Sequence, residues 1–222
     1  DYAAIYVHKS SGFSIVNNVV RDSFFGILVE KSKKGRISGN QVLGTATSED
    51  QSGNGIHLWD CDNILISNNT VTGMRDGIYL EFVDSSVVKD NLSVKNVRYG
   101  LHFMFSNHDS YQGNTFERNG AGVAVMFSKW IEMKNNTFVQ NWGSASYGLL
   151  LKEIYDGEVI GNTFDKNTIA IYVDGSSRVN YTENIFRQNG WAVKVSGGCY
   201  TNHFKSNDFV SNSFGISYNS ML

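Results

Sequence analysis

Residues 69–91 read NTVTGMRDGIYLEFVDSSVVKDN and contain one complete copy of a repeat that runs along the chain. An asparagine stands at position 69 and again at position 91, and between them Gly77 is followed by an aliphatic residue. From Gly77 to Glu81 apolar and polar residues alternate, which is the period-two pattern of a β-strand rather than a helix. The stretch therefore predicts one short, β-stranded turn of a repeat protein.

The same two markers recur from end to end of the sequence. The asparagine returns with steps of 22, 29, 22, 23, 22, 26, 22 and 23 residues, and a small residue followed by an aliphatic one marks ten turns. The asparagines are Asn18, Asn40, Asn69, Asn91, Asn114, Asn136, Asn162, Asn184 and Asn207, and the small residues are Ala4, Gly26, Gly55, Gly77, Gly100, Gly122, Gly148, Ala170, Ala192 and Gly215. Positions one and three after the small residue are apolar, so we expect them to form the core.

A period near 22 residues, with strands and no helical segment, is typical of a right-handed parallel β-helix whose turns stack about 4.8 Å apart. We predict an all-β fold, a single solenoid domain over residues 1–222 that belongs to a longer chain, with longer loops at 41–54 and 137–147. In-register asparagines can bond one another up the stack, and the absence of proline suits a chain in which every ladder N–H is needed. Phenylalanines from Phe116 to Phe209 are expected to stack inside.

Charge and composition exclude several functions. With 19 basic and 21 acidic residues and a net charge of −2, the chain lacks the clustered Lys and Arg that nucleic acids or anionic lipids require. It has no run of about 18 apolar residues for a membrane span, and its first residues do not resemble a signal peptide. Cys61 and Cys199 stand six turns apart, about 29 Å, and so cannot form a disulfide.

Two columns of side chains alternate with the core and should face outward, where a solenoid can carry chemistry. Between Gly55 and Met126 they consist of His57, Tyr79, His102 and Ala124, and of Trp59, Glu81, Met104 and Met126. His102 and Met104 are two residues apart on one expected strand, and Met126 stands one turn above Met104. Imidazole and thioether ligands suit Cu(I), so we predict a Cu(I) site at these three residues, with His57 as an outer ligand.

Other interpretations of these residues stay open. Met104 and Met126 could pack under a loop beside a hydrogen-bonded surface His102, or belong to a protein interface. Glycoside hydrolysis needs two carboxylates about 5 to 9.5 Å apart, and no adjacent pair arises on the strand face. Asp60, Asp62 and Asp84 follow the strands and could form a calcium or catalytic cluster, although turn capping is favoured. Cys61 is favoured as a small buried residue over a thiol ligand.

Five motifs between Gly53 and Ile154 resemble the NosD family of periplasmic β-helical proteins. They read GNGIHLW at 53–59, RDGIYL at 75–80, RYGLHFMFS at 98–106, VAVMFS at 123–128 and YGLLLK at 147–152. The resemblance implies a periplasmic accessory protein, not an enzyme, that helps supply copper to nitrous-oxide reductase. It further implies two partners, the membrane subunit of an ABC transporter and a small copper-carrying lipoprotein.

Residues and resemblance together predict a protein that accepts and passes on Cu(I). His102, Met104 and Met126 would receive the ion, and Trp59, Tyr79 and Glu81 would form the partner contact surface around it. One alternative is a β-helix that binds or cleaves carbohydrate, because this fold is a common scaffold for polysaccharide lyases and hydrolases. A third interpretation is a purely structural partner of the transporter. Copper binding without turnover would favour the first interpretation, and release of sugar ends from uronate polymers would favour the second.

Overall fold

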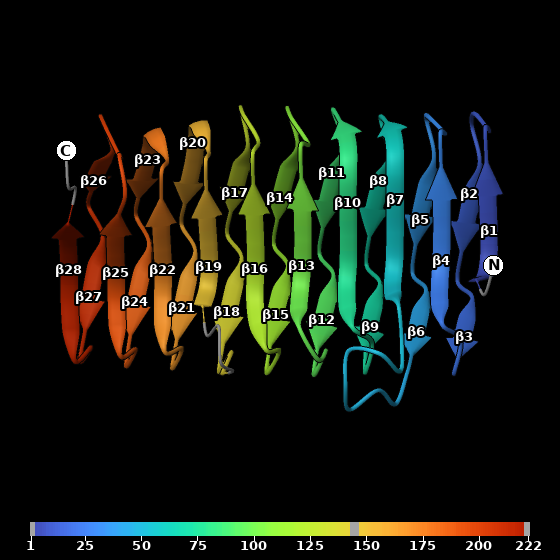
Figure 1. The fold of residues 1–222 in the computed structure, drawn as a ribbon, viewed down its shortest axis with the longest axis horizontal. Helices are drawn as coiled ribbons and strands as arrows, with labels where there is room; N and C mark the ends of the chain where they lie inside the picture. The colour runs from blue at the N-terminus through green and yellow to red at the C-terminus, as the bar shows by residue number, and fades with distance from the viewer. Residues whose placement is uncertain (1–2, 143–146, 220–222) are drawn as a thin grey trace.

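The computed structural model describes residues 3–142 and 147–219 and shows a parallel β-solenoid of ten turns, as the repeat predicts (Figure 1). The described residues contain three sheets and no helix. Sheet A has ten strands, one from each turn. These are β1 (Ala3–His8), β4 (Phe25–Glu30), β7 (Asn54–Asp62), β10 (Asp76–Asp84), β13 (Tyr99–Met104), β16 (Ala121–Met126), β19 (Tyr147–Lys152), β22 (Ile169–Asp174), β25 (Trp191–Ser196) and β28 (Phe214–Asn219).

Two narrower sheets complete each turn, and each has nine strands within the described residues. Sheet B consists of β2 (Ser14–Val16), β5 (Arg36–Ser38), β8 (Leu65–Ser67), β11 (Val87–Lys89), β14 (Ser110–Gln112), β17 (Glu132–Lys134), β20 (Tyr155–Ile160), β23 (Ser177–Thr182) and β26 (His203–Lys205). Sheet C consists of β3 (Val19–Arg21), β6 (Gln41–Leu43), β9 (Thr70–Thr72), β12 (Leu92–Val94), β15 (Thr115–Glu117), β18 (Thr137–Val139), β21 (Thr163–Asp165), β24 (Ile185–Arg187) and β27 (Asp208–Val210).

The predicted core columns lie inside the solenoid. Successive strands of sheet A pair Ile56 with Ile78 and Ile78 with Leu101, and all three side chains are fully buried. On sheet C the rings of Phe138 and Phe164 stack with centroids 4.5 Å apart. Because identical positions repeat at the strand spacing, side chains of similar shape pack directly on one another.

The small-residue column is required by close packing between sheets A and C. A Cβ atom added at Gly100 would lie 2.7 Å from the carbonyl oxygen of Gly122 and 2.7 Å from the side-chain nitrogen of Asn119. Real Cβ atoms do not approach other atoms so closely, so this turn needs glycine.

The asparagine column forms the predicted ladder at the corner between sheets B and C. The Nδ2 of Asn114 donates to Oδ1 of Asn136 at 3.0 Å and to the carbonyl of Val88 at 2.9 Å, while its Oδ1 accepts from the backbone N–H of Asn91. A second ladder, which the sequence analysis did not predict, turns the corner between sheets C and A. Its members are Asn96, Asn119, Asn141, Asn167, Asn189 and Asn212.

The two long connections start later than predicted. Residues 41–43 form β6, so the first connection spans residues 44–53, and it extends from the edge of the solenoid in Figure 1. Residues 137–139 form β18, and residues 143–146 of the second predicted loop lie outside the described residues. No helix among the described residues has the length and hydropathy of a membrane span.

Candidate functional site

Sheet A carries the two predicted outward columns in the expected register. Tyr79 pairs with His57 on one side and with His102 on the other, so these three residues occupy neighbouring strands β7, β10 and β13. In the second column Met104 pairs with Glu81 and with Met126. The spacing of the repeat therefore brings the histidine and the two methionines onto adjacent strands of one sheet face.

His102 is more deeply buried than an outward position predicts. Its exposed fraction is only 7%, because the ring of Tyr79 lies edge-on at 5.0 Å and that of Tyr99 lies at 4.8 Å. Neither ring nitrogen of His102 has a hydrogen-bond partner among the described residues. The alternative of a hydrogen-bonded surface histidine is therefore wrong.

Burial keeps both imidazoles neutral. Desolvation lowers the pKa of His102 to about 4, against a smaller opposing effect of the Asp76 carboxylate. Burial likewise lowers the pKa of His57 to about 4, and the carboxylate of Glu30 opposes this effect. A neutral imidazole nitrogen with no hydrogen bond retains the lone pair that a borderline metal ion needs.

The thioethers lie at the ends of their strands and are partly exposed. Met104 and Met126 are the last residues of β13 and β16, and the side chains of both are partly buried. The hydroxyl of Tyr79 lies 4.0 Å from the sulfur of Met104 and 3.4 Å from a carboxylate oxygen of Glu81. Burial raises the pKa of Tyr79 to about 12, so this hydroxyl stays protonated.

His57 does not join the His102 group directly. The ring of Tyr79 stands between the two imidazoles, with its centroid 4.7 Å from that of His57. One ring nitrogen of His57 contacts the amide of Asn54 at 3.2 Å, and the other has no partner among the described residues. His57 is therefore separated from Met104 by one strand of sheet A and from Met126 by two.

An ion pair between the buried Asp76 and the partly exposed Arg98 is a feature that was not predicted from the sequence. Asp76 is fully buried and accepts two hydrogen bonds from Arg98, at 2.9 and 2.6 Å. Arg98 also lies 3.7 Å from Glu49 in the long connection and stacks on Tyr99. The repeated Arg-x-Gly of RDGIYL and RYGLHFM is the signal that could have revealed this network, which fixes Tyr99 against His102.

The cysteines and the corner carboxylates contribute no ligand cluster. Cys61 and Cys199 are both free and buried, as expected for small core residues, and burial raises the pKa of both thiols. Asp60, Asp62 and Asp84 line a pocket at the corner between sheets A and B. Among the described residues no three His, Cys, Asp or Glu side chains gather as a metal-binding group, so the predicted calcium alternative gains no support.

Several solved β-helices share this fold. PfbA, a surface adhesin of Streptococcus pneumoniae, is similar over 98% of this chain and 64% of its own, with a TM-score of 0.78 and 13% identity. The A-module of the mannuronan C-5 epimerase AlgE4 of Azotobacter vinelandii has a TM-score of 0.65 and 14% identity over 92% of this chain and 80% of its own. DFA-IIIase from Arthrobacter chlorophenolicus A6 without its lid has a TM-score of 0.70 and 16% identity over 88% and 54%. At such identities the likeness shows the fold alone.

Sequence comparison gives a more specific result. A protein of Pseudomonas aeruginosa described as a probable ABC transporter binding protein NosD is 35% identical over 77 residues, which are 34% of this chain and 18% of that relative. The chain thus aligns with less than a fifth of its curated relative. The family described as periplasmic copper-binding protein (NosD) matches residues 1–98 and 43–221. The chain therefore belongs to the NosD family of periplasmic copper-binding proteins.

Proposed function

We propose that this chain is a periplasmic accessory protein that accepts Cu(I) at His102, Met104 and Met126 and passes it on without catalysing a reaction. The observation that carries the proposal is the neutral imidazole of His102, which is buried and has no hydrogen-bond partner among the described residues. An unsatisfied buried polar group destabilises a fold by about 1–3 kcal/mol, so its retention calls for a functional explanation. Binding of a soft cation such as Cu(I) would provide this functional explanation.

The arrangement suits a cargo ion that must also leave. Thioethers and imidazole are uncharged and bind Cu(I) in preference to harder ions. Met104 and Met126 are partly exposed residues, so their thioethers would meet the incoming ion first and the imidazole would complete its coordination. The neutral ligand set leaves the ion without charge compensation, which favours release to a partner with anionic ligands.

The family supplies the expected partners. The Pseudomonas relative is described as an ABC transporter binding protein, and this supports an association of our chain with the membrane subunit of such a transporter. We further propose that a copper-carrying lipoprotein is the donor and that nitrous-oxide reductase is the final acceptor. Trp59, Tyr79 and Glu81 lie on β7 and β10, to one side of the methionines on the same sheet face, and would contact these partners.

An anaerobic Cu(I) competition titration against a chromophoric chelator tests the site. The wild-type chain should take up one equivalent, and the variant His102→Phe, Met104→Leu, Met126→Leu should lose it while its circular dichroism spectrum stays native. The matched control is His203→Phe, an exposed histidine on β26 of sheet B, which should bind like the wild type. Equal Cu(I) affinity in wild type and triple variant would overturn the proposal.

A polysaccharide screen tests the absence of catalysis. The solved neighbours include an epimerase acting on mannuronan, so polymannuronate is the substrate to incubate with the chain. We expect no conversion of mannuronate to guluronate units, no unsaturated ends and no new reducing ends. Steady product release would replace the copper proposal with the carbohydrate alternative.

A further inference from the structure

Three phenylalanines form a ladder of exposed rings at the corner between sheets A and B. Phe82, Phe105 and Phe127 stand on consecutive turns and are 49%, 40% and 43% exposed. Their rings stack almost in parallel, with centroids 5.3 and 5.2 Å apart. The repeat pattern does not predict this ladder, because its residues alternate out of phase with the two columns of the strand face.

The backbone at these rings is left-handed, as it is at the same corner position of the other described turns, but the residue type is unusual for it. Phe82, Phe105 and Phe127 have φ angles of 53°, 50° and 53°, in a left-handed region that bulky residues seldom occupy. Elsewhere in the same corner column the chain uses polar residues or glycine: Lys31, Asp60, Glu153 and Gly175. Strained, exposed aromatic residues on three adjacent turns are a reason to look for a binding function.

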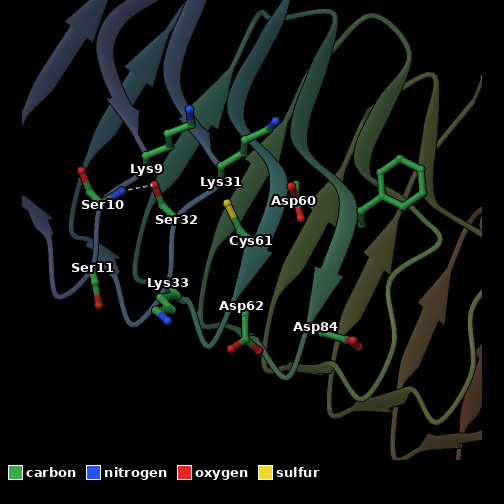
Figure 2. Close-up of a pocket in the computed structure, with 11 residues that line it drawn as sticks. Lys9, Ser10, Ser11, Lys31, Ser32, Lys33, Asp60, Cys61, Asp62 and Asp84 are labelled. Carbon is green, nitrogen blue, oxygen red and sulfur yellow. Dashed lines mark hydrogen bonds between the residues drawn. The ribbon is translucent and has the colours of Figure 1, made fainter.

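A charged pocket of about 520 Å³ adjoins the ladder and shares Phe82 with it. Figure 2 shows Lys9, Lys31 and Lys33 on one side of this pocket and the carboxylates Asp60, Asp62 and Asp84 on the other. The lysines belong to turns one and two, and the aspartates belong to turns three and four.

The charges of the pocket are largely unneutralised. Within residues 3–142 and 147–219, neither the three lysines nor Asp60 and Asp62 form a salt bridge. Asp84 lies 3.5 Å from His108, whose exposed ring stacks on Trp130 beside the ladder. Along the solenoid axis the surface therefore runs from positive, through negative, to aromatic.

We propose that this corner binds an extended segment of a partner protein that carries acidic, basic and apolar side chains in that order. Acidic side chains would meet Lys9 and Lys31, basic ones would meet Asp60 and Asp62, and apolar ones would cover the ladder. From turn one to turn six the surface spans five steps of about 4.8 Å, which matches roughly seven residues of extended chain. The proposal uses none of the proposed copper ligands.

The chemistry favours a polypeptide over a polysaccharide. Sugars stack on the faces of aromatic rings, whereas the inner faces of this ladder are covered by neighbouring rings. A uronate polymer has charges of one sign only, so the aspartates would repel the part of it that the lysines attract. A ligand that complements both the lysines and the aspartates must carry positive and negative charges within a few residues, which a protein sequence can do.

Fluorescence anisotropy with two labelled peptides tests the proposal. The matched peptide has three glutamates, three lysines and three leucines in that order, and the other has the glutamate and lysine blocks exchanged. At low ionic strength the matched peptide should bind about tenfold more tightly, since charge complementarity sets register. Equal affinity for the two peptides, or no binding of either, would overturn the proposal.

Variants locate the binding surface. We expect about a tenfold loss of affinity for the matched peptide in Phe82→Ser, Phe105→Ser, Phe127→Ser and, separately, in Lys9→Glu, Lys31→Glu. The matched control is Lys194→Glu on β25, outside this corner. Affinity unchanged in both corner variants would contradict the proposal, as would displacement of the peptide by oligomannuronate. Both variants should still bind Cu(I), so a failure here leaves the copper proposal standing.

Discussion

Cys61 occupies a position that serine fills on nearby turns. The hydroxyls of Ser32 and Ser106 donate to the carbonyl two residues earlier, at 2.8 and 2.9 Å, and the thiol of Cys61 makes the same contact with Trp59 at 3.4 Å. Cys61→Ser should therefore change the free energy of unfolding by no more than about 1 kcal/mol and leave Cu(I) uptake unchanged. A large loss of Cu(I) affinity in the chelator titration would instead make this thiol a ligand.

Asp109 makes stability depend on pH. This carboxyl is buried inside the solenoid, where desolvation raises its pKa to about 8, whereas an unfolded chain gives about 3.9. The folded state thus holds a proton that the unfolded state loses, so the contribution of Asp109 to stability is fully present below about pH 4 and is lost as the pH rises towards 8. Asp109→Asn retains an acceptor for the N–H of Ser86 and removes the titrating group.

Urea unfolding at several pH values checks this prediction. At pH 8 the Asn variant should be more stable than the wild type by on the order of 2–4 kcal/mol, and the two should converge near pH 4. Asp174→Asn is the control, since this exposed-face carboxylate on β22 is only partly buried. A constant difference between Asp109→Asn and wild type at all pH values would contradict the assigned titration.

The environment of a single side chain is harder to predict from the sequence than its position in the repeat. The repeat places His102 and Met104 in outward columns, because side chains alternate along a strand. It does not predict that Tyr79 and Tyr99, which lie 23 and 3 residues away, rotate their rings over the imidazole. The burial of His102, and therefore its low pKa, depends on how the side chains around it are oriented. A pattern of residue types does not determine this orientation.

The asparagine ladder is the element that holds one corner together. In the middle of the ladder, Asn114 bonds to Asn91 on one side and to Asn136 on the other. Asn114→Ala would leave several buried backbone and side-chain groups without partners, at a cost of about 2–4 kcal/mol. Asn18→Ala, at the end of the ladder with only Asn40 as its side-chain neighbour, should cost less. Equal losses in urea unfolding would show that the ladder does not act cooperatively.

The strands and side-chain ladders could be predicted from the sequence wherever the spacing of the repeat determines their positions. The first ladder, the phenylalanine stack and the order of strands follow from intervals in the chain, since parallel pairing brings equivalent positions together. The second ladder was equally accessible: each of its six asparagines stands five residues after a member of the first, as Asn96 follows Asn91. The exposed ladder of Phe82, Phe105 and Phe127 could not be predicted in this way. Nine described turns have a left-handed residue at this corner, and no residue type is characteristic of that position.

The whole molecule is a stack in which each turn contacts only its neighbours, so distant features are energetically separate. Phe105 and Phe127 directly follow Met104 and Met126 in the chain, whereas the rings that cover His102 within the described residues are those of Tyr79 and Tyr99. A solenoid thus presents several independent surfaces along one rod. The copper ligands and the phenylalanine ladder share turns five and six, so the Cu(I) titration of the ladder variant is itself the check that the two surfaces act separately.

In the 222-residue chain taken by itself, β28 is the last strand of the described residues. β28 pairs only with β25, and it exposes Phe214, Ile216 and Tyr218 by 53%, 47% and 52%. A strand edge with exposed apolar side chains invites pairing with another copy of the chain. We expect the isolated 222-residue chain to self-associate with rising concentration in sedimentation velocity experiments, and Ile216→Lys to shift it towards the monomer. The control is Ile185→Lys, because Ile185 is also apolar and 41% exposed but lies on β24 of sheet C. This variant should associate like the wild type. The same shift in both variants would mean that net charge, rather than the strand edge, controls association.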